Sequence, residues 1–164
     1  MKLTVEFETK RFNAALHKFI KKSNLSTDIV IKKVAFDLLS IILKPPPKGR
    51  HPVLSGRSRA AWYPSVQGLG KKFDFSAGVK GQNKVAEGKN KGDFNSHLGP
   101  IYLDKFVEMI NSVDYILFLE MGSSQQAPWG MVRVALRKLR GGKMPWELEK
   151  KYQDDWKKIF GSTI

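Results

Sequence analysis

The chain has 164 residues, 41% of them hydrophobic, and a formal net charge of +14, which is the composition of a globular protein about one average domain in size. It contains no cysteine, which excludes disulfides, a thiol nucleophile and cysteine-ligated metal sites. The alternating, charged start of the chain is unlike a signal peptide, and the longest apolar run, Leu38–Leu43, is too short to cross a bilayer. We therefore expect a soluble protein that is made in a reducing cytoplasm.

The first part of the chain predicts a strand and two helices. Alternating apolar and polar residues predict a half-buried strand over residues 2–8. Helical spacing predicts a helix over residues 11–22, with His17 on its solvated side. A longer helix is expected over residues 27–43, buried on most of its circumference because its polar residues form one narrow stripe. The stripe consists of Lys33, Asp37, Ser40 and Lys44. Three prolines at 45–47 are expected to end this helix.

The middle of the chain predicts short elements. Residues 54–62 fit a short helix. A weak strand from Val66 and a better one over residues 72–79 fit a hairpin that turns at residues 68–70. Residues 80–99 are rich in glycine, asparagine and lysine and have little to bury, which predicts a long mobile loop or arm.

The last third of the chain predicts helices, with one ambiguous segment. The periodicity of residues 101–110 fits both a helix and a strand. An apolar run follows at residues 115–119. Pro128 occupies the position of a first helical residue, and Trp129 belongs to the apolar face of the helix that it begins. Another amphipathic helix is expected from Pro145.

Together these elements predict an α+β fold in a single domain over residues 1–164. A small antiparallel sheet of three to five strands is expected to pack against the long core helix over residues 27–43. Additional helices are expected toward the C-terminus, the last of them within residues 143–164.

The basic residues are unevenly distributed. Residues 1–50 carry eleven Lys/Arg against four Asp/Glu, whereas residues 101–164 carry ten against eight. An excess of this kind favours an anionic partner, since each neutralised phosphate releases counterions. A merely solubilising surface explains it equally well.

Residues that could perform catalysis are dispersed along the chain. No two of the three histidines lie within one helical turn, and the carboxylates are scattered. The chain has no P-loop, Rossmann or GxSxG motif. We therefore expect no catalytic residue, no cofactor, no metal site and no enzymatic activity.

Two segments carry more specific patterns. Residues 51–62 read HPVLSGRSRAAW, and residues 111–132 read NSVDYILFLEMGSSQQAPWGMV. The first resembles a PV-x-T/S-G-x-x-R-x-x-W element and the second an N-x-x-x-Y-x-x-x-L-E-x-G-x-S-x-Q-A-P-x-G-M-V element. In this order they resemble the neck or tail-completion family of tailed bacteriophages, small head–tail joining proteins related to the lambda tail-completion protein and often called minor tail proteins. The resemblance covers roughly residues 25–140.

The resemblance implies a non-enzymatic virion protein, synthesised in the bacterial host, that forms a six- or twelvefold ring in the phage neck. Its partners would be other copies of itself, the head–tail connector or adaptor, and the tail-terminator or tail-tube proteins. Genomic DNA would pass through the ring without sequence-specific contacts, and no membrane is involved. The resemblance also favours a strand over residues 105–111 and a short helical turn over residues 115–119. The alternative is a non-specific nucleic-acid-binding protein, and a small basic nuclease ranks third.

The two patterned segments supply the candidate subunit contacts. Gly56 and Gly122 suit positions where the backbone turns with positive φ. Glu120 lies among apolar residues, so its carboxylate needs a partner such as an arginine of the same or an adjacent subunit. The expected ring-interface residues are Pro52, Val53, Gly56, Arg57, Trp62, Tyr115, Glu120, Gly122, Gln126, Pro128 and Trp129. The basic residues expected at the DNA channel or a mating face are Lys44, Lys48, Arg50, Arg59, Lys71, Lys72, Lys80, Lys84, Lys89 and Lys91.

Overall fold

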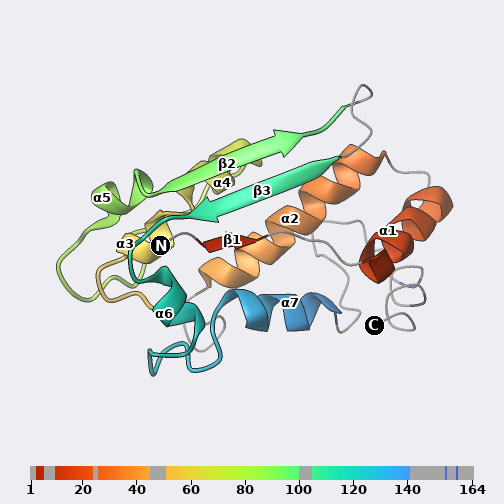
Figure 1. Ribbon diagram of the computed structural model, residues 1–164. Helices are drawn as coiled ribbons and strands as arrows, with labels where there is room; N and C mark the ends of the chain where they lie inside the picture. The colour runs from red at the N-terminus through yellow and green to blue at the C-terminus, as the bar shows by residue number, and fades with distance from the viewer. Residues whose placement is uncertain are drawn as a thin grey trace.

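The computed structural model combines helices with an antiparallel sheet (Figure 1), which confirms the mixed fold class. It describes residues 3–5, 10–23, 26–44, 51–99 and 105–140, together with Asp154 and Lys158. The elements in chain order are β1 (Leu3–Val5), α1 (Lys10–Ser23), α2 (Thr27–Leu43), α3 (Arg57–Ala60), α4 (Tyr63–Gly68), α5 (Val85–Lys89), β2 (Gly92–His97), β3 (Phe106–Asn111), α6 (Ile116–Glu120) and α7 (Val132–Arg140). No helix in these described ranges is long and apolar enough to cross a membrane.

The described strands form a sheet in the order β1-β3-β2, with antiparallel pairing on both sides of β3. Asn111 at the end of β3 is opposite Leu3 in β1 and Gly92 in β2. Residues 3–5 of the strand expected at residues 2–8 form β1, and its remaining residues lie outside the described ranges. The strand that the resemblance favoured over residues 105–111 is confirmed as β3.

Helix α2 lies along the sheet, with α7 beside it (Figure 1), and it contacts both β3 and α7. The Ser26 side chain caps its first turn by accepting from the backbone N–H of Ile29 at 3.3 Å. The expected helix boundaries are confirmed, and Leu38 and Leu39 are fully buried. The polar stripe, in contrast, is not the solvent-facing side: Asp37 and Ser40 are both buried, and the Ser40 hydroxyl donates to the Asp37 carbonyl at 2.8 Å.

The helix α1 is also confirmed, with His17 exposed as expected. The prolines at 45–47 lie outside the described ranges, so their role in ending α2 stays a prediction. The same holds for the helix expected from Pro145, of which Asp154 and Lys158 are described, both helical.

The predicted hairpin over residues 66–79 is wrong. Val66 belongs to the short helix α4, where it is buried, and no regular strand forms over residues 72–79. Alternation of apolar residues is real there, since Phe75 is buried against Tyr63 and Phe73. The carbonyls of Phe75 and Ala77, however, accept hydrogen bonds from a buried arginine side chain, which replaces a sheet partner.

The predicted mobile loop over residues 80–99 is also wrong, because it contains α5 and β2. Val85 anchors α5 in the core, and Gly88 lies so close to the Arg57 carbonyl that a Cβ would collide with it. β2 pairs with β3 along its whole length, and the Phe94 ring packs directly on Gly68. Backbone pairing and close glycine contacts therefore order a segment that has few apolar side chains.

Candidate functional site

The two patterned segments, residues 51–62 (the first motif segment) and residues 111–132 (the second motif segment), lie against each other in the structure. Asn111 is fully buried, and its side-chain amide donates to the Ser58 carbonyl at 2.8 Å. Its side-chain oxygen accepts from the Val113 backbone N–H at 3.2 Å. One buried asparagine thereby joins α3 to the end of β3, and it satisfies backbone groups on both sides.

Two further contacts join the motif segments. The Gln126 side-chain oxygen accepts from the Val53 backbone N–H at 3.3 Å. The Arg57 guanidinium lies 3.4 Å from the Asp114 carboxylate and 5.8 Å above the Tyr115 ring centroid. The motif segments are thus connected near both of their ends, although about fifty residues separate them in sequence.

The position before Arg57 requires a glycine for two reasons, its backbone conformation and the lack of space for a side chain. Gly56 precedes α3 with φ +73°, in the left-handed region that favours glycine. A Cβ at Gly56 would lie only 2.8 Å from the Val85 side chain. The helix expected over residues 54–62 is therefore shorter than predicted: α3 starts after Gly56 and ends at Ala60, and α4 begins beyond the predicted range, at Tyr63.

The buried Glu120 carboxylate caps the N-terminus of α7. Its two oxygens accept from the backbone N–H groups of Met131, Val132 and Arg133 at 2.8, 2.9 and 2.8 Å. The Arg133 side chain pairs with the same carboxylate at 3.4 Å and donates to the Glu120 carbonyl. The expectation of an arginine partner is confirmed within this chain, and the unpaired amides of a helix start supply the remaining contacts.

This cap explains why α7 begins at Val132 and not at Pro128 as predicted. The carboxylate of Glu120 fixes the first helical amides three to five residues beyond the proline. Gly130 adopts φ +75° and lies so close to Glu120 that a Cβ would overlap it. Gly122, with φ +93°, is packed in the same way against the Pro128 carbonyl. The loop between α6 and α7 is held from both ends.

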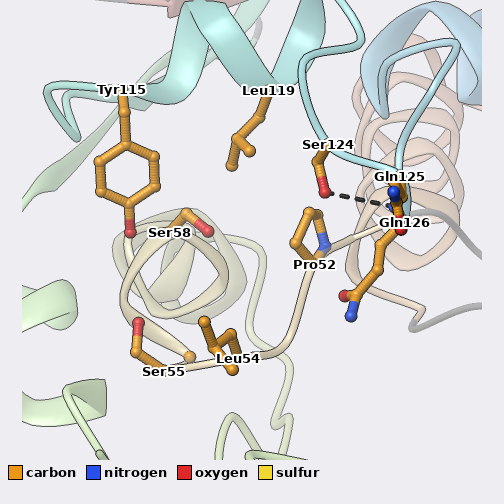
Figure 2. A pocket seen from close by; sticks show the side chains of 10 residues that line it. Pro52, Leu54, Ser55, Ser58, Tyr115, Leu119, Ser124, Gln125 and Gln126 are labelled. Atoms are coloured by element: carbon orange, nitrogen blue, oxygen red, sulfur yellow. Dashed lines mark hydrogen bonds between the residues drawn. The ribbon is translucent and has the colours of Figure 1, made fainter. Parts of the chain in front are cut away.

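A pocket of about 450 Å³ lies between the motif segments. Pro52, Leu54 and Ser55 form one wall, and Tyr115, which precedes α6, and Leu119 of α6 face them (Figure 2). The remaining lining residues are Gly56, Ser58, Ser124, Gln125 and Gln126. None of the ten lining residues is charged, so the pocket offers apolar surface, hydroxyls and side-chain amides.

Several large apolar side chains of the two motif segments are exposed. They are Leu54, which lines the pocket, Phe118 on α6, and Met121 and Trp129 on the loop that follows. Trp129 is 64% exposed, so it does not pack inward as predicted for the α7 face. Exposed aromatic and large apolar side chains are enriched on surfaces that bind other proteins.

The candidate interface residues divide into a buried and an accessible group. Val53, Gly56, Trp62 and Glu120 are buried within the chain, so they support the site from inside. Trp62 in particular is a fully buried core residue. The accessible or half-buried residues are Pro52, Arg57, Tyr115, Gly122, Gln126, Pro128 and Trp129.

The candidate basic residues also differ in how exposed their side chains are. Lys72, Lys80 and Lys84 are exposed, whereas Lys71 lies 4.8 Å over the Phe36 ring and Lys89 lies 4.6 Å over the Tyr63 ring. Lys44 and Lys91 are half-buried. Lys48 and Arg50 lie outside the described ranges.

Arg59 is fully buried. The prediction that its side chain lies at a DNA channel or a mating face is therefore wrong. Its guanidinium donates to the Phe75 carbonyl at 2.7 Å and to the Ala77 carbonyl. Burial lowers the pKa of Arg59, and the charge of Asp74 opposes that effect. The residue ties the irregular segment after α4 to α3, so it acts inside the chain.

His51 is buried close to Arg59. Its Nδ1 donates to the Pro52 carbonyl at 3.1 Å, and its Nε2 has no hydrogen-bond partner among the described residues. Burial lowers the pKa of His51 from 6.5 to about 4, and the positive charge of Arg59 acts in the same direction. The imidazole is therefore neutral at physiological pH, at the start of the first motif segment.

Within the described ranges, no group of three or more His, Asp or Glu residues could hold a metal ion. Comparison of the chain with known protein families, with curated proteins and with solved structures found no match. The site is therefore interpreted from its own residues.

We predict that Glu120→Ala lowers the free energy of unfolding by about 3 kcal/mol, because it leaves three amides of the α7 start without their charged acceptor. Chemical denaturation of the full chain measures this change. Asp114→Ala is the matched control: its carboxylate is exposed, and its loss should cost less than about 1 kcal/mol. Equal effects of the two substitutions would contradict the capping role of Glu120.

We predict that the free energy of unfolding falls as the pH decreases from about 6.5 to about 4, with His51 contributing about 3 kcal/mol to the loss. The sign follows from the lowered pKa: the unfolded chain takes up a proton first, and above pH 6.5 the imidazole is neutral in both states. Denaturation at several pH values should give a shallower dependence for His51→Gln than for the wild type. The exposed His17→Gln variant is the control, and an unchanged slope in His51→Gln would refute the assignment.

Proposed function

We propose that this chain is a structural, non-enzymatic virion protein that forms a ring in the neck of a tailed bacteriophage. In this role it joins the connector side of the DNA-filled head to the tail and surrounds the DNA channel. Its partners are other copies of the chain, in a six- or twelvefold ring, the head–tail connector or adaptor, and the tail-terminator or tail-tube proteins. In this role the protein binds neighbouring subunits and shapes the channel, and it catalyses no reaction.

The observation that carries the proposal is the contact between the two motif segments. The resemblance to neck proteins depends on these segments alone, and they lie far apart in sequence. Contacts of Asn111, Arg57 and Gln126 nevertheless connect the two segments. Residues of both segments line one pocket. Their juxtaposition supports the interpretation that both serve one function.

The exposed lysines support a path for DNA. Lys72, Lys80 and Lys84 are exposed on the irregular segment that follows α4. Lysines of this kind bind phosphates without reading bases, which suits DNA that must slide through a ring. Because Arg59 is buried, it takes no part in such contacts.

The alternative function is sequence-independent nucleic-acid binding by a protein that forms no ring. The same exposed lysines and the formal net charge of +14 favour it. The two proposals differ in assembly and not in their contacts with DNA.

Negative-stain electron microscopy of the purified chain tests the proposal, and we expect closed rings with a central opening. The triple variant Lys72→Glu, Lys80→Glu, Lys84→Glu should form the same rings while losing binding to duplex DNA, which in the wild type should fall steeply as salt is added. A wild type that stays monomeric and binds duplex DNA would support the alternative. Rings that neither bind nor enclose DNA would contradict the channel.

A further inference from the structure

Helix α1 has a cationic face that the proposed function does not use. The helix contains five Lys/Arg residues and no Asp/Glu. Exposed side chains occur at residues 14, 17, 18, 21 and 22, and this i, i+3, i+4 spacing places them on one side of the helix. They are Ala14, His17, Lys18, Lys21 and Lys22. We call this surface the α1 face.

The positive charge of the α1 face is not neutralised inside the described ranges. Lys18 and Lys21 have no hydrogen-bond or ion-pair partner there. The carboxylate that follows α1 most closely in these ranges, Asp28, is already paired with Lys105 at 2.7 Å. The helix dipole favours a lysine in the last turn, which accounts for Lys21 but not for Lys18. A cationic face of this kind attracts an external polyanion.

The opposite side of α1 is apolar and already covered. Ala15 and Phe19 are almost fully buried, and α1 packs against α2. A helix that lies on a membrane needs its apolar side for the lipid, so this mode of binding is not available to α1. Protein interfaces are rich in aromatic residues and poor in lysine, whereas the five exposed residues of the α1 face include no large apolar side chain. The composition of the face therefore favours phosphates over a membrane or a protein.

We infer that the α1 face binds the phosphate backbone of duplex DNA and is a second DNA-binding surface of this chain. Lys18 and Lys21 lie about one turn apart on the same side of the helix, so both can reach phosphates of one duplex. Each lysine that neutralises a phosphate releases counterions, and neither lysine has to read a base. The contact is independent of DNA sequence and sensitive to salt.

The α1 face is separate from the exposed lysines at residues 72, 80 and 84. Helix α5 follows Lys84 directly, and α1 and α5 lie at opposite ends of the molecule (Figure 1). Helix α2, which has 17 residues and is about 25 Å long, lies between them in this view. The chain thus has two distinct cationic surfaces. The inference goes beyond the proposed function, because binding by the α1 face does not require a ring.

Binding of duplex DNA by the full chain, measured at several salt concentrations, tests the inference. In the double variant Lys18→Gln, Lys21→Gln, the slope of log K against log salt should become shallower by about 2 for each bound chain, since each lost phosphate contact removes about 0.9. The matched control is Arg137→Gln, Lys138→Gln, which removes the same charge from the exposed side of α7 and should leave the slope nearly unchanged. A wild-type slope in the α1 variant, or equal losses in both variants, would overturn the inference.

Acetylation of lysine side chains locates the contact without a substitution. The full chain is treated with an N-hydroxysuccinimide ester of acetate, with and without duplex DNA, and the modified residues are identified by mass spectrometry. DNA should protect Lys18 and Lys21 and leave Lys138 as reactive as in the free chain. Protection confined to the lysines of residues 72–84 would overturn the inference and leave the proposed function intact.

Polyglutamate in the same assay separates DNA from an acidic protein as the partner. At equal concentrations of negative charge, DNA should protect Lys18 and Lys21 more strongly than polyglutamate does, because duplex DNA has the denser charge. Protection by polyglutamate and not by DNA would overturn the inference in favour of an acidic protein. A chain that stays monomeric and still shows the protection by DNA would support the inference while contradicting the proposed ring.

Discussion

The capping of α7 by Glu120 is the interaction on which the rest of the site depends. A buried carboxylate that accepts three backbone amides and an arginine fixes where α6 ends and where α7 begins. The intervening loop then has one shape, since Gly122 and Gly130 are packed against backbone and side-chain atoms with no room for a Cβ. That shape holds Gln126 toward the first motif segment and Trp129 toward solvent.

The buried Asn111 is a second constraint. It lies at the end of β3, and its side chain bonds to Ser58 of α3 and to Val113, which precedes α6. The apolar core beneath includes α2, Trp62 and Met131, so the motif segments lie on a rigid base. The polar residues of the motif segments therefore have mainly internal partners, whereas the apolar residues Leu54, Met121 and Trp129 remain exposed. Exposed large apolar side chains of this kind are more frequent on surfaces that bind other proteins.

Sequence periodicity could predict the elements whose stability is local or strongly amphipathic. The α2 boundaries, α1 and the need of Glu120 for an arginine follow from spacing, capping residues and burial of charge. The helical turn at residues 115–119 was expected only from the family resemblance. The segment over residues 66–99 could not be predicted, because its order comes from distant partners: Arg59 satisfies its carbonyls and β3 pairs with β2. For the same reason the burial of Arg59 and the exposure of Trp129 could not be read from residue type. At the site itself, the sequence did predict the positive φ of Gly56 and Gly122.

The central claim is that the two motif segments form one surface through which copies of the chain assemble. Amide hydrogen exchange of the full chain, measured at concentrations below and above assembly, tests it most directly. The account predicts that the protection gained on assembly concentrates in residues 52–58 and 115–130, the residues of the pocket walls and of the loop that carries Trp129. Protection gained only in α1, α2 and the sheet, with these two segments unchanged, would contradict it.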